Sequence, residues 1–421
     1  MTAPVKTAHD SSNTLIGVTG RFYFPIALLA RLPYAMMVVG VLTLVVSARG
    51  ELELGGLSSA MTGIGTAVCG PLIGAAADRF GQRFVVLSAG IVNSLALLAM
   101  SLVAFSSAPS VIVLVIAVVI GASAPQVSPM SRSRLVDIIH HRLPADRQER
   151  VFNGTMAYES AADEIVFVVG PFIVGLLATT LNPAAPVIGA ALLTLLFVSA
   201  FALHPSGATR SFLVEDMGSA TASAPKQAPA AELFRFSLLV IVVGALGMGL
   251  FFGSTLTALT SFLQDRGHPE QAGLIYGVMG IGSTILALGM AWFSPRFTLR
   301  ARGVVFALLL VVATSGLIFV DNVFQIAAIL FVVGFGVGPS LVVQYSVGAE
   351  RSPRGRSATV MTMLGSALIL GEALSAAAVG TLAQSSGTGA ALLMPFLSAL
   401  VVFAAAAANW FVSGRAPRSI R

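Results

Sequence analysis

Four ionisable side chains lie inside long apolar stretches of this sequence. They are Arg31, Asp163, Glu164 and Glu372. A charged group in apolar surroundings is costly, so such residues pair with one another or take part in function. A carboxylic acid held among apolar groups can also take up a proton near neutral pH. Proton transfer is therefore the first chemistry that these residues indicate.

The two adjacent acids cannot face the same way on a helix. Successive residues are rotated by about 100°, so if one of Asp163 and Glu164 faces Arg31, the other faces elsewhere. We expect one acid to pair with Arg31 and the other to exchange protons. Glu164 is the first choice for the proton carrier, with Asp163 or Glu372 as the second. The alternative is an arginine–acid pair that only fixes helix packing.

The stretches that position these residues have the composition of transmembrane helices. Of 421 residues, 56% are hydrophobic and 10% are charged, whereas a soluble domain carries about 25% charged residues. The mean hydropathy of +0.90 agrees with this composition. In hydrocarbon, apolar runs of about 20 residues satisfy their backbone groups as helices and not as barrel strands. The sequence therefore predicts an all-α membrane protein with twelve transmembrane helices. The predicted spans are 22–47, 57–77, 84–105, 111–130, 152–179, 184–204, 236–263, 271–294, 303–320, 324–347, 357–383 and 389–412.

The positive charges are distributed unevenly between the two sides of these spans. With the predicted boundaries, 21 of the 24 lysines and arginines, Arg132 and Arg134 among them, fall in the terminal segments and in alternate loops. Such residues stay on the cytoplasmic side during insertion. We therefore expect both termini in the cytoplasm and the protein in the plasma membrane, here the bacterial inner membrane. The lipid bilayer is then its solvent, and nucleic acid is not an expected partner.

A polar segment at 205–235, rich in Ala, Ser and Pro, divides the spans into six plus six. This predicts an N-terminal bundle at 1–204, a cytoplasmic linker at 205–235 and a C-terminal bundle at 236–421. Short matches between the halves support the division, such as Met61-Thr-Gly-Ile-Gly65 with Met279-Gly-Ile-Gly282. Two homologous bundles can rock against each other around a central site.

The most specific motif lies between the second and third spans and consists of Gly74, Asp78, Arg79, Gly81 and Arg83. Here the chain resembles the major facilitator superfamily, whose signature places these residue types at this spacing. The resemblance implies a fold of two pseudo-symmetric six-helix bundles and transport by alternating access.

The acid of this motif stands just beyond a helix C-terminus. There it is well placed to cap a neighbouring helix N-terminus or to bind a cation. We expect Asp78 to pair with Arg79, Arg83 or an arginine of 131–150 in one conformation only, as a conformational latch. The alternative is that the arginines only set topology. The second half repeats the arginines as Arg296, Arg300 and Arg302, but Pro295 matches Asp78, so only the first copy can be a latch.

A second motif, in the fifth span, consists of Gly170, Pro171 and Gly175. It resembles part of the glycine–proline motif of the antiporter branches of the superfamily, although Val166 and Val174 stand where that motif has glycine. Proline removes a backbone hydrogen bond and kinks a helix, which can shape the contact between the bundles. The partial match favours export over uptake.

The resemblance also implies a substrate cavity lined mainly by the first, fourth, seventh and tenth spans. Candidate residues there share aromatic, thioether or amide side chains: Tyr34, Met37, Gln126, Tyr158, Phe251, Phe252, Tyr276, Gln344 and Tyr345. Methionine and aromatic groups suit a broad apolar site. We expect fewer than half of them to contact a ligand and the rest to be packing residues.

These features predict a secondary active transporter that exports a small amphiphilic compound or drug in exchange for protons, as a monomer. The first alternative is proton-coupled uptake or export of a metabolite, and the second is a membrane sensor or scaffold that does not transport. An enzyme is not expected, because the five histidines lie in loops or at span ends without metal-ligand spacing. No cofactor or metal site is expected.

Overall fold

The computed structural model describes residues 14–208, 227–267, 272–294 and 296–414, and within these ranges the chain forms helices and no strand. Twelve of the helical segments are long and apolar enough to cross a membrane. The predicted all-α fold with twelve spans is therefore confirmed. The α-helices are α1 (Leu15–Thr19), α2 (Tyr23–Leu29), α3 (Leu32–Arg49), α4 (Leu52–Phe80), α5 (Gln82–Val103), α6 (Ser110–Ala122), α7 (Val127–Arg142), α8 (Ala145–Thr180), α9 (Ala185–Leu193), α10 (Ser199–Leu203), α12 (Phe236–Gln264), α13 (Ala272–Gly289), α14 (Leu299–Ser315), α15 (Val323–Glu350), α16 (Ser357–Ser386) and α17 (Thr388–Gly414).

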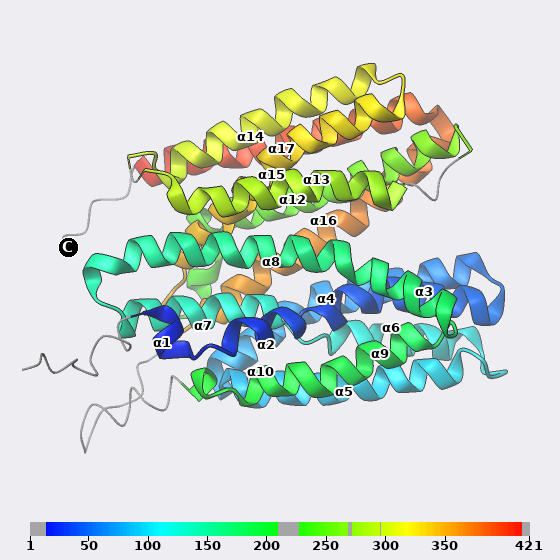
Figure 1. The fold of residues 1–421 in the computed structure, drawn as a ribbon, viewed down its shortest axis with the longest axis horizontal. Coiled ribbons are helices and arrows are strands. Elements are labelled where there is room, and N and C mark those ends of the chain that lie inside the picture. The colour runs from blue at the N-terminus through cyan, green and yellow to red at the C-terminus, as the bar shows by residue number, and fades with distance from the viewer. Residues whose placement is uncertain (1–13, 209–226, 268–271, 295, 415–421) are drawn as a thin grey trace, which may run out of the picture.

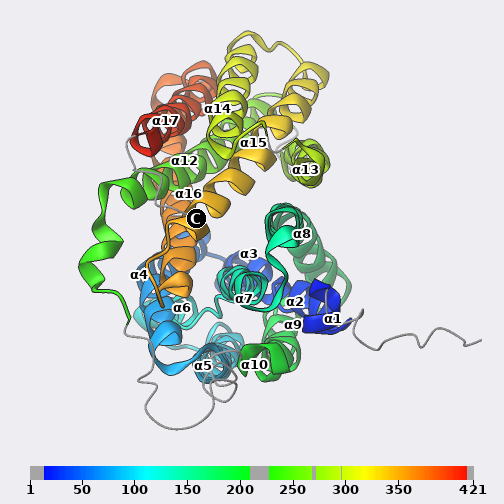
Figure 2. The same cartoon turned by 90° about the vertical axis from the view of Figure 1, so that its left-hand side faces the viewer.

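The helices form two groups that follow the order of the chain. In Figure 1 the first group, α2 to α10, lies below the second group, α12 to α17. Seen end-on in Figure 2, α4 lies beside α16 on one flank, and α8 lies beside α13 on the other. Contacts of α16 with α7 and of α15 with α8 also join the halves. The larger hydrophobic core combines residues of α12 to α17 with Ile139 of α7 and Met156 of α8, whereas α3, α5, α6 and α9 pack around a core within the first half.

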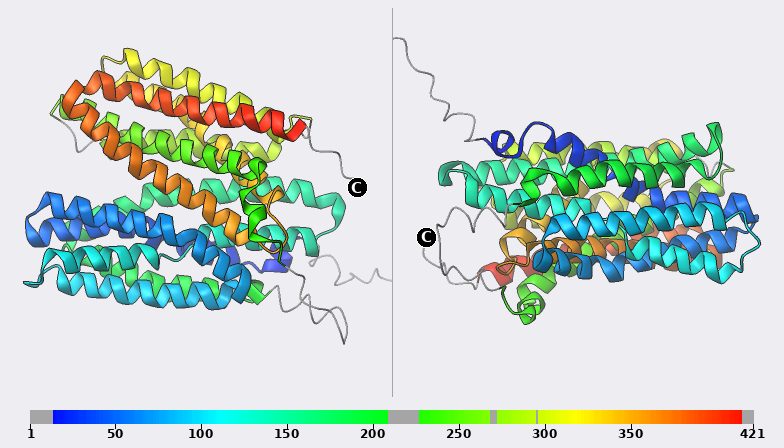
Figure 3. Two further views of the ribbon diagram at one scale, coloured as in Figure 1. Left: turned by 180° about the vertical axis from the view of Figure 1, so that it is seen from behind. Right: turned by 90° about the horizontal axis from the view of Figure 1, so that it is seen from below.

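Both ends of the described chain lie at the same end of the bundle (Figures 1 and 3). The same end carries the start of α16 and a short 3₁₀ helix, Ala230–Phe234, that closes the segment between the halves. We call it the linker end. The backbone N–H of Ala228 donates to the carbonyl of Arg354 at 3.1 Å, so the segment is held against the loop that precedes α16.

The fourth span is longer than predicted. It runs over Ser110–Arg142, with a break between α6 and α7, whereas the sequence prediction ended it at residue 130. The prediction stopped there because Arg132 and Arg134 follow, and these were assigned to a cytoplasmic loop. That assignment is wrong, since both side chains are buried, at 1% and 2% exposed. A hydropathy argument counts an arginine as polar whether or not the fold supplies a partner.

Close helix packing in the second half depends on glycines. A Cβ on Gly249 would lie 1.9 Å from the carbonyl oxygen of Leu368, and one on Gly371 would lie 2.3 Å from that of Leu246. These contacts bring the backbones of α12 and α16 together, because glycine leaves room for a neighbouring helix. α16 is therefore held firmly by its own half along one face.

Replacing Gly249 by alanine should destabilise the protein by about 1–3 kcal/mol, because the added methyl group overlaps a backbone atom that cannot rotate away. Gly63→Ala in α4 is the control, since a Cβ there has nothing within 4 Å. Thermal unfolding of the purified variants in detergent measures the difference. Equal melting temperatures for Gly249→Ala and Gly63→Ala would contradict this account of the packing.

Candidate functional site

Arg31 stands at the break between α2 and α3, and its guanidinium group reaches two acids on α8. One is Glu159, whose carboxylate pairs with Nη2 of Arg31 and is fully buried. The other is Asp163, whose Oδ1 lies 3.1 Å from Nη1 of Arg31. Residues four apart lie one above the other on a helix. Glu159 and Asp163 therefore present two carboxylates to the same arginine.

A second arginine completes this group. Nη2 of Arg132, on α7, lies 2.8 Å from Oδ2 of Asp163. The hydroxyl of Ser128 donates to the same oxygen at 2.7 Å and accepts from Nη1 of Arg132 at 2.7 Å. The guanidinium of Arg132 lies 3.8 Å from the ring centroid of Tyr345, which belongs to α15. The group thus reaches from the first half of the molecule into the second.

We call Arg31, Arg132, Glu159 and Asp163 the buried charge group. With all four ionised, its two positive and two negative charges cancel. Opposite charges at these distances attract strongly where water is excluded, which offsets the cost of burying them. The arrangement agrees with the alternative interpretation, in which an arginine–acid pair fixes helix packing. Asp163 in addition has three hydrogen-bonding or ionic partners, Arg31, Arg132 and Ser128.

The sequence interpretation found part of this group. It expected an acid of α8 beside Arg31, and Asp163 occupies that position. It missed Glu159, although Glu159 and Asp163 are four positions apart and this spacing places both on one face of α8. It also missed Arg132, which it had assigned to a loop. Only the backbone of Glu164 is described, so the proton-carrier prediction for its side chain lies outside the described structure.

Glu372 lies halfway along α16, far from both ends of the helix. Its side chain makes no hydrogen bond or ion pair within the described residues, and it is partly exposed. Leu370 and Leu374, two positions away on either side, are 42% and 54% exposed. A separation of two residues is about 200° around a helix, so Glu372 faces away from the side that these leucines present to lipid.

At the linker end, α4 of the first half meets α16 of the second. Oδ2 of Asp78 accepts hydrogen bonds from the backbone N–H of Thr359 at 2.7 Å and from its hydroxyl at 2.6 Å. Oδ1 accepts from the backbone N–H of Ala358 at 3.1 Å. These N–H groups form the first turn of α16, where the helix dipole favours negative charge. Asp78 therefore caps a helix of the opposite half.

Glycines of α4 let the two helices approach at this contact. A Cβ on Gly74 would lie 2.1 Å from Oγ1 of Thr362, and one on Gly70 would lie 2.4 Å from Oγ of Ser366. Gly70, Gly74 and Asp78 are spaced by four residues and so form one stripe along α4. The stripe and its partners on α16 make a closely packed interface between the halves.

The rest of this motif forms the turn between α4 and α5. Gly81 has a φ of +91°, which other residues rarely adopt. Arg79 and Arg83 are exposed, and the guanidinium of Arg79 lies 5.2 Å from the ring centroid of Phe80. The structure gives Asp78 the helix-capping role that its position suggested. Its pairing with an arginine remains a prediction.

In the second copy of the motif, Pro295 lies outside the described residues. Arg302 is buried and donates to the carbonyl groups of Phe297 at 2.6 Å and Ser294 at 3.1 Å. These bonds satisfy backbone oxygens in the connection that precedes α14. This arginine therefore stabilises a turn in its own half.

Arg134 anchors the start of the segment between the halves. Its guanidinium lies 4.1 Å from the ring centroid of Phe201, donates to the carbonyl of Phe201 at 3.1 Å and contacts the Ser206 hydroxyl at 3.3 Å. Burial, and secondarily the positive charge of Arg134, lower the pKa of His204 below its ordinary value. His204 is therefore neutral at neutral pH and shares a hydrogen bond with Ser206 at 2.9 Å.

The glycine–proline motif lies within the uninterrupted helix α8. A Cβ on Gly170 would lie 2.6 Å from that of Ala35 in α3, so this glycine permits a close contact inside the first half. Nothing lies within 4 Å of the same position on Gly175, and the side chain of Pro171 is outside the described structure. Gly170 therefore packs α8 against α3 within the first half and not against the second half.

The predicted cavity residues fall into two sets. Met37, Gln126 and Phe251 are buried, as expected of packing residues. Tyr34, Tyr158, Phe252 and Tyr276 are partly exposed, and Tyr345 lies under Arg132. Tyr158 contacts Phe24 edge-on with ring centroids 5.2 Å apart.

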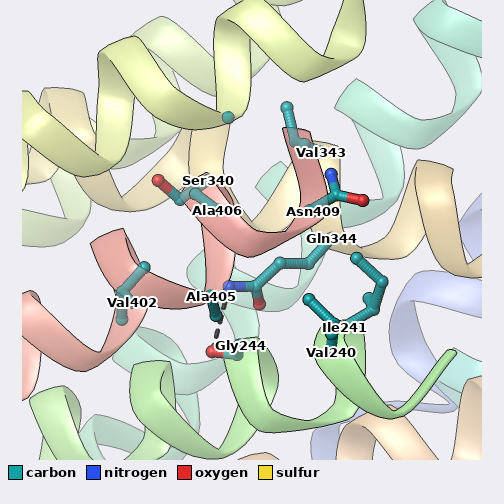
Figure 4. A pocket seen from close by; sticks show the side chains of 11 residues that line it. Val240, Ile241, Gly244, Ser340, Val343, Gln344, Val402, Ala405, Ala406 and Asn409 are labelled. Carbon is teal, nitrogen blue, oxygen red and sulfur yellow. Dashed lines mark hydrogen bonds between the residues drawn. The ribbon is translucent and has the colours of Figure 1, made fainter. Parts of the chain in front are cut away.

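Gln344, the remaining predicted cavity residue, lies beside a small cavity in the second half. It lines a cavity of ≈ 30 Å³ between α12, α15 and α17 of the second half, and its Nε2 donates to the carbonyl of Gly244 at 3.0 Å (Figure 4). Ser340 and Asn409 line the same cavity. A cavity of this volume holds about two waters, so it is too small for a substrate. It belongs to the packing of one half.

Twelve apolar helices in two halves, joined by polar contacts and holding charges at mid-membrane, define an integral membrane protein of the transporter type. A family description, "Major Facilitator Superfamily", matches residues 23–365. The chain belongs to this superfamily, as its loop motif indicated.

Known proteins agree with this assignment. The multidrug efflux pump Tap of Mycolicibacterium fortuitum is 25% identical over 336 residues, covering 77% of this chain and 80% of Tap. The human organic anion transporter MFSD10 (TETRAN) has the same fold, with a TM-score of 0.68, 18% identity and coverage of 94% and 99% of the two chains. A bacterial homologue of the iron transporter ferroportin, in an outward-facing state, has a TM-score of 0.66, 15% identity and coverage of 92% and 99%.

Replacing Glu159 by glutamine should destabilise the protein by about 3–5 kcal/mol, because it removes one negative charge from a buried group and leaves an excess positive charge. Glu51→Gln, at an exposed position, is the control. Thermal unfolding in detergent at neutral pH measures both variants. A melting temperature for Glu159→Gln equal to that of the control would show that the buried charges do not depend on one another.

Replacing Asp78 by alanine removes the acceptor at the first turn of α16. The loss of this cap should lower the stability of the protein by about 1–2 kcal/mol. Hydrogen exchange of a peptide covering residues 357–364 should become faster, because the amides of Ala358 and Thr359 lose their acceptor. Asp146→Ala is the control, since Asp146 is an exposed acid in the first turn of α8. Unchanged exchange would mean that Asp78 does not hold α16.

Proposed function

We propose that this superfamily member is a proton-coupled efflux transporter for a small amphiphilic compound. The observation that carries the proposal is Glu372. This carboxylate lies at the middle of a membrane-spanning helix, on the face turned away from lipid, without an ion pair or hydrogen bond in the described part of the chain. An acid in such a place is stable only when it is protonated or bound to a cation.

The acids of the molecule differ in their fitness as proton carriers. Asp163 is bonded to two arginines and a serine, which favours its ionised form and makes it a poor proton acceptor in this conformation. Glu372 lacks such partners within the described residues. Glu164, the first choice from the sequence, remains a candidate. We propose that Glu372 or Glu164 exchanges the proton and that Arg31 and Asp163 keep the first half intact.

Alternating access needs contacts between the halves that can be broken. The cap of Asp78 on α16 and the stacking of Arg132 on Tyr345 both cross from one half to the other. We propose that the structure represents the state closed at the linker end, with that end in the cytoplasm. Opening would separate Asp78 from α16, as expected of a conformational latch.

Export is favoured by two features. Tap is described as a multidrug efflux pump, and the similarity extends over most of both chains. The Gly170-Pro171 pair in α8 resembles the antiporter motif. We further propose that the protein works as a monomer in the bacterial inner membrane with both termini in the cytoplasm. Transport of a metabolite is the competing function, and a panel of substrates separates the two.

A strain that lacks this protein should accumulate fluorescent amphiphilic compounds, and restoring the protein should lower their level only while the proton gradient persists. The measurement is dye accumulation in cells with and without a protonophore. Glu372→Gln or Glu164→Gln should remove the gradient-dependent part without lowering the amount of protein in the membrane, because the amide cannot carry a proton. Glu51→Gln is the control.

Efflux that continues after collapse of the gradient would exclude proton coupling. Accumulation that does not respond to the protein at all, combined with a phenotype on a particular nutrient, would favour the metabolite function.

A further inference from the structure

We infer that the ligand of this protein is a lipophilic organic cation, and that Glu372 together with Tyr34 recognises it. The inference rests on the proposed transport function for its physiological meaning.

The balance of charge at the centre of the molecule favours a positively charged ligand. The buried charge group contains two arginines and two acids that pair with one another. An anionic ligand would find both guanidinium charges already balanced by carboxylates. Glu372 adds a further negative charge for which the described residues provide no counter-ion. A cationic ligand supplies that missing charge, and burying the resulting pair is far less costly than burying the acid alone.

Glu372 lies on a face of α16 that is directed toward the other helices of the bundle. Gly365 precedes it by seven residues, which is close to two full helical turns, so the two share one face of α16. A Cβ on Gly365 would lie 3.7 Å from the ring of Pro129 in α7 and 3.9 Å from the hydroxyl oxygen of Tyr345 in α15. The face that carries Glu372 is therefore turned toward α7 and α15, near the contact between Arg132 and Tyr345.

Aromatic side chains near Glu372 also suit a cation. Tyr34 of α3 is partly exposed and lies within electrostatic range of Glu372, Tyr345 and Asp163. A cation over a tyrosine ring is attracted by the negative face of the ring. Arg132 already uses Tyr345 in this way. Tyr34 and Glu372 come from opposite halves, so a bound cation would contact both halves at once.

A metal ion is a poorer fit than an organic cation. Hard metal ions require several oxygen ligands, and transition metals prefer sets of imidazole or thiolate groups. No group of three or more His, Cys, Asp and Glu side chains suited to a metal occurs among the described residues. One carboxylate beside tyrosine rings instead suits a single charge on a bulky apolar body.

The test is equilibrium binding to the purified full chain in detergent at one fixed pH. Tetraphenylphosphonium and tetraphenylborate are the probes, because they have nearly the same shape and opposite charges. The wild-type protein should bind the cation more tightly than the anion. Glu372→Gln should weaken binding of the cation by about tenfold or more, and Tyr34→Leu by about threefold to tenfold. Glu51→Gln, a change of the same kind at an exposed position, should leave binding unchanged.

Equal affinity for the two ions, or no binding of either, would overturn the inference, as would unchanged binding of the cation by Glu372→Gln. The comparison of ions on the wild-type protein needs no variant, so a variant that fails to fold does not obscure the result. Binding does not depend on a proton gradient. Selective cation binding without gradient-driven efflux would refute the proposed function alone, and gradient-driven efflux without cation selectivity would refute this inference alone.

Discussion

An ion in hydrocarbon must find its counter-ion inside the protein, and this constraint shapes the centre of the molecule. Arg31 binds Glu159 and Asp163, and Arg132 binds Asp163 from another helix. The four residues come from the α2–α3 break, from α7 and from α8, so their pairing fixes the positions of these elements. Separating any member would leave a charge that lipid cannot solvate.

Close glycine packing occurs both within a half and between the halves, where Gly70 and Gly74 of α4 lie against α16, but the junction also includes polar contacts. Within a half, glycines such as Gly249 bring helix backbones together, and such packing is costly to disturb. Between the halves, the contacts include a carboxylate at a helix N-terminus and a guanidinium over a tyrosine ring. Each of these contributes a modest free energy and can be replaced by water or by other polar groups. Polar contacts of this kind can be exchanged when two bundles move against each other.

The acids near the middle of the membrane have unequal surroundings, and this inequality suggests a division of roles. Asp163 and Glu159 are held by arginines, so they are suited to maintaining structure. Glu372 stands on a helix of the other half without a partner among the described residues. A carboxylate without a partner can bind a proton or a cation, whereas one that is paired with an arginine binds them poorly. Exchange chemistry is therefore expected on the second half, close to the junction.

Composition, the length of the apolar runs and the Gly74-to-Arg83 motif determined the membrane location, the number of spans and the family, because these depend only on local sequence. The sequence also indicated that Arg31 needs an acid and that Asp78 suits a helix N-terminus. It could not show that Arg132 lies inside the bundle, that Glu159 is the second partner of Arg31, or that Asp78 caps α16, 280 residues further along the chain. Whether a charge is paired depends on which distant helix packs beside it, and only the tertiary structure decides that.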